Sequence, residues 1–181
     1  MSDTTLTKEL LAQSMKKLMK KKSFDKISVI DICEGCGMNR KSFYYHFKDK
    51  YDLVNWIFYS DFLLLTTQRR YENGWDLLVA VSELFKKDKV FYRRAMEIEG
   101  QNCFRDFFCE STTPIFSLFL KELSDDEILQ EKGIPYMTDA FLAVMKRWLI
   151  DGGDQTPEEF VSNLRVVLTG IGKVADKKFP V

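Results

Sequence analysis

The sequence predicts an all-α protein made of a small three-helix head and a larger helical body. Apolar residues recur every three or four positions along most of the 181 residues, and no stretch shows the sustained period-two alternation typical of strands. The formal net charge is zero, but residues 1–50 carry 11 Lys+Arg against 6 Asp+Glu, which leaves 16 against 21 for residues 51–181. A basic head on an acidic body is expected when only the head meets phosphates.

The first helix is expected at residues 5–22, where one apolar stripe with i, i+3, i+4 spacing packs on the two helices that follow. Its lysines are interpreted as a solvated face rather than as base-reading residues, although they can add electrostatic attraction to DNA. The stripe consists of Leu10, Leu11, Ser14, Met15, Leu18 and Met19, and the lysines are Lys16, Lys17, Lys20, Lys21 and Lys22.

A short second helix and a tight turn follow. Ser28 opens an S-x-x-D start, in which the hydroxyl accepts from early backbone N–H groups and Asp31 favours the helix N-terminus. The helix runs to about residue 36, with Ile32 among the residues that face inward. Gly37 stands where a left-handed residue ends such a helix.

The third helix, residues 40–47, buries Phe43 and Phe47 at i, i+4 and leaves its other face to a partner. Asn39 can cap this helix, and Asp49 caps the next one, whose first turn combines exposed N–H groups with a cation that attracts phosphate. Two short helices around a glycine turn indicate a helix-turn-helix and therefore DNA binding. The expected DNA-facing residues are Ser28, Asn39, Arg40, Lys41, Ser42, Tyr44, Tyr45, His46 and Lys50.

Different roles are expected within this set. Arg40 and Lys41 lie at the N-terminal end of the recognition helix, where long cationic donors reach guanine O6 and N7, and Ser42 can also reach a base edge. DNA contact is favoured for His46 over metal binding or general-base catalysis, because nothing nearby in sequence supplies a second ligand or an orienting acid. Phosphates, which fix register without carrying sequence information, are the expected partners of Ser28, Tyr44, Tyr45, His46 and Lys50. Packing in the core is the alternative interpretation for Tyr44.

The rest of the chain is expected to be helical at residues 50–70, 75–87, 90–97, 102–109, 114–123, 135–151 and 157–176. Thr113 before Pro114 and Thr156 before Pro157 each indicate a helix start. Pro135, together with a nearby glycine, is interpreted as the break before the last helical hairpin.

The last two helices each carry a wide apolar stripe. One interpretation is an intrachain core, and the other is packing against a second copy of the chain; both hold if one edge of a stripe serves the core and the other a partner. We expect a homodimer through Phe141, Val144, Met145, Trp148, Leu149, Leu164, Val167, Leu168 and Ile171.

An aromatic-rich stretch in the body has two interpretations. It can line an apolar ligand cavity, or it can form core, which is favoured for aromatics at helical spacing. The residues concerned are Phe91, Tyr92, Phe104, Phe107, Phe108, Phe116 and Phe119.

Enzymatic motifs are missing from the sequence: it has no G-x-S-x-G, no phosphate-cradling glycine loop and no metal-ligand spacing of His and Glu. We therefore expect no enzyme, no cofactor and no metal site. Cys33 and Cys36 have C-x-x-C spacing, but their inward positions favour packed thiols over zinc or a redox pair. Neither a signal peptide nor a membrane-spanning run is recognisable, so a cytoplasmic location is expected.

The first quarter of the chain resembles the DNA-binding domain of TetR-family transcriptional regulators. The resemblance rests on Gly37, on the Tyr-x-His-Phe ending of the recognition helix at residues 44–47, and on Lys50 at the start of helix 4. It implies an N-terminal DNA-binding domain at residues 1–50, a C-terminal dimerisation and effector domain at residues 51–181, and a pseudo-palindromic operator. It also implies a phosphate contact for the hydroxyl of Tyr44.

A narrower resemblance is to the Firmicutes-type activators of dihydroxyacetone kinase operons. It is carried by the runs SFDKISVIDIC, CGMNRKSFYYHF and DKYDLVNWIF, by a GQN-F stretch at residues 100–104, and by a late helix around Trp148. It implies an activator that docks a dihydroxyacetone-binding, kinase-like co-regulator protein instead of binding the ligand itself. The alternative is a repressor that senses a small apolar ligand in its own C-terminal pocket.

Overall fold

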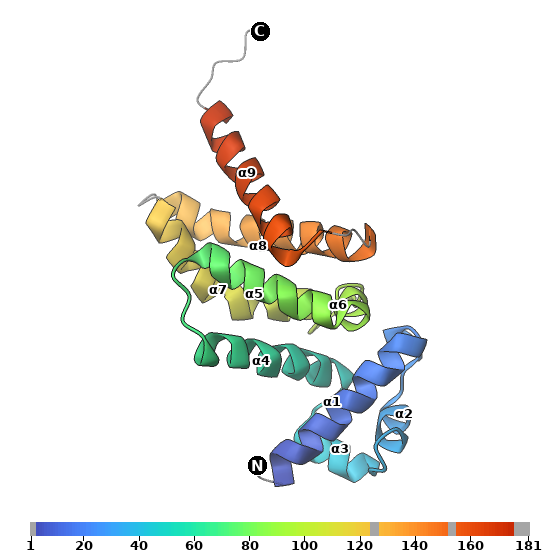
Figure 1. Ribbon diagram of the computed structural model, residues 1–181. Helices are drawn as coiled ribbons and strands as arrows, with labels where there is room; N and C mark the ends of the chain where they lie inside the picture. The colour runs from blue at the N-terminus through green and yellow to red at the C-terminus, as the bar shows by residue number, and fades with distance from the viewer. Residues whose placement is uncertain (1–2, 124–126, 152–154, 176–181) are drawn as a thin grey trace.

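The computed structural model describes residues 3–123, 127–151 and 155–175, which contain helices and no strand (Figure 1). The all-α prediction is confirmed. No helix in these ranges is both long and apolar enough to cross a lipid bilayer. The elements in chain order are α1 (Asp3–Lys21), the 3-10 turn η1 (Phe24–Lys26), α2 (Val29–Glu34), α3 (Arg40–His46), α4 (Lys50–Gln68), α5 (Gly74–Lys87), α6 (Lys89–Ala95), α7 (Phe104–Leu123), α8 (Glu127–Asp151) and α9 (Pro157–Ala175).

Helices α1 to α3 form a head at one end of the molecule, α5 to α9 form a body at the other, and α4 lies between them (Figure 1). Helix α4 contacts α1 on the head side and α5 and α7 on the body side. The buried apolar side chains form one cluster that extends from Leu11 in α1 to Val161 in α9. Because head and body share this core, the orientation of the head is set by packing and not by a loose linker.

The apolar stripe of α1 packs as expected. Leu11, Met15 and Met19 are fully buried, whereas Leu10 and Leu18 at its edges are half-buried. The lysines on the remaining surface do not all behave as a solvated face, which corrects the expectation for two of them. Lys16 and Lys22 form ion pairs, while the other three are exposed.

The contact between α1 and α2 depends on a glycine. The hydroxyl of Ser14, buried in α1, donates a hydrogen bond of 2.7 Å to the carbonyl of Ile32 in α2. Gly35 ends α2 beside it, and a Cβ atom at Gly35 would lie 2.2 Å from Ser14 Oγ. The two backbones approach this closely because Gly35 has no side chain.

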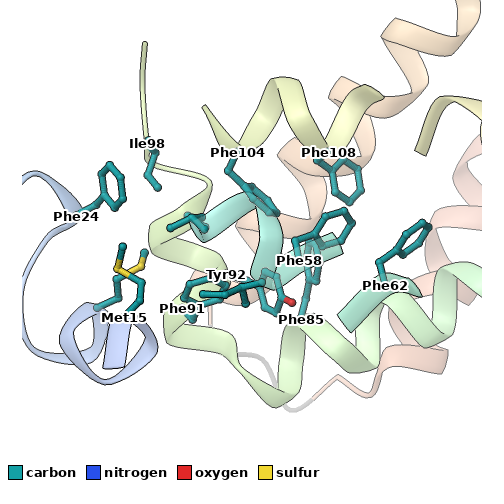
Figure 2. Packing of buried hydrophobic residues seen from close by; sticks show 14 of the residues in the cluster. Met15, Phe24, Phe58, Phe62, Phe85, Phe91, Tyr92, Ile98, Phe104 and Phe108 are labelled. Carbon is teal, nitrogen blue, oxygen red and sulfur yellow. The ribbon is translucent and has the colours of Figure 1, made fainter. Parts of the chain in front are cut away.

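Aromatic rings fill the centre of the body. Phe58 of α4 lies among rings from α5 and α7, with its centroid 6.0 Å from Phe85, 5.5 Å from Phe104 and 5.2 Å from Phe108 (Figure 2). Tyr92 of α6 stacks on Phe85 at 4.3 Å. The core interpretation of the aromatic stretch is confirmed for Phe91, Tyr92, Phe104, Phe108 and Phe116, which are buried, while Phe107 is half-buried and Phe119 lies outside the residues whose side chains are described.

Two predicted helix breaks are wrong. Pro114 lies inside the continuous helix α7, and Pro135 lies inside α8, which begins at Glu127. A proline in a helix interior removes one N–H donor. The hydroxyl of Thr113, expected to mark a helix start, instead donates to the carbonyl of Cys109 one turn earlier in α7 at 2.7 Å. Packing of α7 along α8 then outweighs the local cost of each proline.

We predict that Gly35→Ala lowers the free energy of unfolding by about 1–3 kcal/mol, because the new Cβ overlaps the Ser14 hydroxyl. Urea denaturation followed by circular dichroism measures the loss. Removing the hydroxyl should restore most of it, since the Cβ of residue 14 would be 3.4 Å from the new methyl group. The clash would be contradicted if the double variant Gly35→Ala, Ser14→Ala lost at least as much free energy of unfolding as the two single variants together.

Candidate functional site

The start of α2 is fixed by a reciprocal capping box. The Ser28 hydroxyl accepts from the backbone N–H of Asp31 at 3.2 Å, and the Asp31 carboxylate accepts from the backbone N–H of Ser28 at 2.7 Å and from its hydroxyl at 2.8 Å. The Ser28 N–H and the ammonium of Lys22, 3.0 Å away, lower the pKa of Asp31 to about 2. The Ser28 hydroxyl is thus committed to this cap, although the residue is exposed at the surface where phosphate contact is expected.

The turn between α2 and α3 has the expected left-handed glycine, since Gly37 has φ +71°. The N–H of Met38 closes the turn by donating to the Cys33 carbonyl at 2.9 Å. Burial raises the pKa of the Cys33 and Cys36 thiols above the ordinary value, and Cys36 Sγ lies 3.4 Å from the carbonyl oxygen of Ile32. These contacts are those of packed thiols.

Helix α3 is held by one cap and two rings. The side-chain oxygen of Asn39 accepts from the backbone N–H of Ser42 at 2.8 Å. Phe43 is fully buried, and Phe47 is 3% exposed with its ring 5.6 Å from that of Trp56 in α4. Because these anchors lie on one side of α3, the opposite side faces away from the core.

The outward side of α3 carries the exposed residues Arg40, Lys41, Tyr44 and Tyr45. Tyr45 is 80% exposed, and Tyr44, at 50%, lies beneath the guanidinium of Arg40 at 5.8 Å. A planar cation held over a ring on an exposed helix suits recognition of base edges. Ser42 is half-buried with its hydroxyl 4.0 Å from Met38 Sδ, so it is turned further inward than expected.

His46 ends α3 and is half-buried. Burial and then the nearby charge of Lys8 lower the pKa of its imidazole, so the ring is neutral at pH 7 and offers a hydrogen bond instead of a charge. The effect of Lys8 on His46 could not be predicted from the sequence, because 38 positions separate the two residues. Lys48, exposed two residues after the end of α3, is a further cation on this surface. It was not among the predicted DNA-facing residues, although it directly follows the Tyr-x-His-Phe run.

Lys50 is placed differently from the expectation. Its ammonium does not point outward from the first turn of α4 but back to η1, where it donates to the carbonyls of Phe24 at 2.9 Å, Asp25 at 3.4 Å and Ile27 at 3.0 Å. This geometry competes with the phosphate contact expected for the side chain.

The expected dimer set divides between core and surface. Phe141, Met145, Trp148 and Leu149 are between 0% and 9% exposed within a single chain, so most of their surface is covered by their own chain, and their contact with a second copy stays a prediction. They face the body because the buried stripe of α8 packs against the helices of the same chain. Val144, Val167 and Leu168 are 41–55% exposed, Leu164 is half-buried, and Ile171 lies outside the residues whose side chains are described.

The exposed members line grooves beside α9. A groove of about 550 Å³ between α8 and α9 is bounded by Val144, Trp148, Leu164 and Val167, with a polar rim that includes Arg147 and Asp151. Only the first turns of α9 are buried, and its C-terminal part projects beyond the body (Figure 1).

Comparison with known proteins gives two family matches. Residues 14–57 match a model described as "Bacterial regulatory proteins, tetR family". Residues 73–170 match a model described as "Transcriptional regulator C-terminal region". Together they cover both the helix-turn-helix and most of the body.

One similar curated protein is the HTH-type dhaKLM operon transcriptional activator DhaS of Lactococcus lactis subsp. lactis, with 28% identity over 109 residues. That match covers 60% of this chain and 57% of the relative. A solved structure titled "Dihydroxyacetone kinase operon activator DhaS" aligns with a TM-score of 0.67 over 94% of this chain and 98% of that one. At 22% identity, this alignment shows a shared fold.

Proposed function

The chain belongs to the TetR family of bacterial regulatory proteins, and from this premise we propose a homodimeric, sequence-specific activator of a dihydroxyacetone kinase operon. In this proposal residues 1–50 bind DNA, and residues 51–181 supply dimerisation and the effector response. The observation that carries the DNA-binding part is the exposed side of α3, held outward by the burial of Phe43 and Phe47.

The α3 side chains fit the geometry of a recognition helix. Arg40 and Lys41 lie in its first turn, where they would reach base edges in the major groove. Tyr44, Tyr45 and His46 follow and would hold phosphates on either side, which fixes register. The positive charge of the first 50 residues adds sequence-independent attraction.

Dimerisation is supported by the incomplete surface of α8 and α9. Val144 and Val167 are exposed apolar side chains on opposite walls of one groove, and the projecting part of α9 has no covering helix among the described residues of its own chain. A second copy packed here would bury both stripes and place two recognition helices for successive turns of DNA.

An effector that acts through a partner protein is supported by the filled body. The aromatic rings of α4 to α7 occupy the centre, and the pocket beside α5, α7, α8 and α9 measures about 190 Å³ and is lined almost entirely by carbon. Dihydroxyacetone, with two hydroxyls and a carbonyl, needs hydrogen-bonding groups that this lining scarcely offers. The candidate partner is a catalytically idle relative of a dihydroxyacetone kinase subunit that docks on the acidic body.

The second candidate is a repressor whose own pocket binds a small apolar ligand. It is favoured by the same pocket, whose lining of Trp75, Phe116, Met137 and Leu168 suits an apolar molecule. The two candidates differ in which molecule carries the effector site.

We predict that Arg40→Ala relaxes base preference at one position of each half-site by about 1–3 kcal/mol, because the side chain reads a base edge. Selection from a random-sequence DNA pool, followed by titrations with single-base variants of the selected duplex, measures the change. Lys21→Ala, an exposed lysine of α1, is the matched control and should leave the preference unchanged. An Arg40→Ala variant that weakens all sequences equally would assign Arg40 to phosphate instead.

We predict that the chain is a dimer in solution and that Val167→Glu makes it monomeric, because a carboxylate enters the apolar groove. Light scattering reports the mass, and footprinting should show half-sites about 10–10.5 bp apart or somewhat more. Val166→Glu is the control, since this neighbour is 66% exposed and does not line the groove. Wild-type protein that is monomeric at micromolar concentration yet binds one half-site tightly would disprove the dimer.

We predict that calorimetric titration of dihydroxyacetone into the purified chain gives no binding heat, because the ligand binds the docked protein and not this chain. A ligand shifts a protein between two conformations only by binding one more tightly than the other, so here the docked protein must cause the shift. Titration of operator DNA into the same preparation is the control for active protein. Saturable heat at micromolar dihydroxyacetone together with release from DNA would support the second candidate.

A further inference from the structure

Ile30, in the first turn of α2, is a large aliphatic side chain that the head does not bury. It is 48% exposed, whereas Ile32 in the same helix is fully buried and Val29 packs against the core. Single apolar residues are common on protein surfaces. The position of Ile30, and not its exposure alone, therefore decides what the side chain can bind.

The side of α2 that carries Ile30 lies beside the start of α3. Cys33 follows Ile30 by three residues, so the two side chains are neighbours on one side of the helix. The N–H of Met38, shortly before α3, donates to the carbonyl of Cys33 at 2.9 Å. Burial raises the pKa of the Cys33 thiol, and the positive charge of Arg40 acts in the opposite direction, as a nearby cation does. Helices α2 and α3 pack against each other in the head, so Ile30 belongs to the same surface as Arg40 (Figure 1).

The two residues that follow Ile30 point elsewhere. The Asp31 carboxylate caps α2 and lies 3.0 Å from the Lys22 ammonium at the end of α1. Ile32 points into the core. Successive residues of an α-helix project in directions about 100° apart. Ile30 therefore projects from a side of α2 that neither α1 nor the core covers.

The chemistry of the side chain restricts what it can recognise on DNA. Isoleucine has no hydrogen-bond donor or acceptor, so it can pair neither with the polar base edges nor with phosphate oxygens. In the major groove, thymine alone among the four standard bases presents a methyl group, which side chains recognise by apolar contact. Arg40 and Lys41 are exposed on the same surface and supply the positive charge that attracts a duplex to it.

We propose that Ile30 is a specificity-determining residue of the DNA-binding surface, whose side chain packs against the 5-methyl group of one thymine in each half-site. The proposal rests on the proposed function, because it requires α3 to enter the major groove. It extends base reading from α3 to α2. Arg40 and Lys41 read hydrogen-bonding edges, and Ile30 reads an apolar group at a neighbouring base pair, which must contain thymine.

The test removes the methyl group and the side chain separately and together. A duplex selected by the wild-type chain is prepared with deoxyuridine in place of each thymine in turn, which deletes the 5-methyl group and keeps the base pair. Fluorescence anisotropy measures Kd for the full-length wild-type chain and for Ile30→Ala. Ile150→Ala is the matched control, because Ile150 is also 48% exposed but lies in α8 of the body.

For the wild-type chain, deoxyuridine at one position of a half-site should weaken binding about four-fold, which corresponds to about 0.8 kcal/mol for one buried methyl group. Ile30→Ala should bind the thymine duplex at least about four-fold more weakly, and its Kd values for thymine and deoxyuridine at that position should differ by less than about two-fold. Ile150→Ala should keep the full difference between the two duplexes. Ile30→Val, which lacks one methyl group, should give an intermediate difference.

An effect of deoxyuridine that is unchanged in Ile30→Ala would overturn the proposal and assign the thymine to another side chain. A selected site at which no deoxyuridine weakens wild-type binding would overturn it as well. In both cases the chain still binds DNA, so the proposed function stands. A wild-type chain that selects no sequence would instead contradict the proposed function, and Ile30 would have no base to read. If circular dichroism shows that Ile30→Ala does not fold, Ile30→Val decides, because it must still reduce the effect of the methyl group.

Discussion

The arrangement of the molecule depends on a cluster of charges where head and body meet. Lys16 of α1 lies 3.1 Å from a carboxylate oxygen of Asp61 in α4 and 2.9 Å from one of Asp88 at the corner of α5 and α6. The buried Tyr92 hydroxyl donates to Asp61 at 3.0 Å. Burial alone would lower the pKa of Lys16, but the two carboxylates outweigh it and raise the pKa. Such a partly buried network is costly to break, because each group left unpaired keeps its desolvation penalty.

This charge cluster adds to the shared apolar core in holding the helix-turn-helix in one orientation relative to the body. Arg94 of α6 adds a second tie by donating to the carbonyls of Met19 and Lys22 at the end of α1. Aromatic rings of α4, α5 and α7 pack immediately behind these polar contacts, so α4 has little room to slide without opening the core. Helices α4 and α6 are thus the elements through which the head contacts the body most extensively.

Much of the structure of the head could be predicted from the sequence, because the residues that fix its helix ends and buried positions lie within a few residues of one another. The capping box of Ser28 and Asp31, the left-handed Gly37 and the inward pair Phe43 and Phe47 follow from local spacing, and each is present. The break predicted at Pro114 was wrong because the signal for a break is local, whereas the packing of α7 on α8 that overrides it is not.

The sequence by itself determined the helical class, the caps of α2, α3 and α4, the exposed side of α3 and the charge difference between head and body, because these depend on residue type and helical period. Only the tertiary structure decided which lysines make contacts within the chain. Lys16 and Lys50 look like surface lysines in the sequence, yet carboxylates and carbonyls brought from distant segments surround them. It also decided which edge of α8 packs in the core and which stays exposed to a partner. An amphipathic stripe shows which side of a helix is buried but not whether the same chain or a second one covers it.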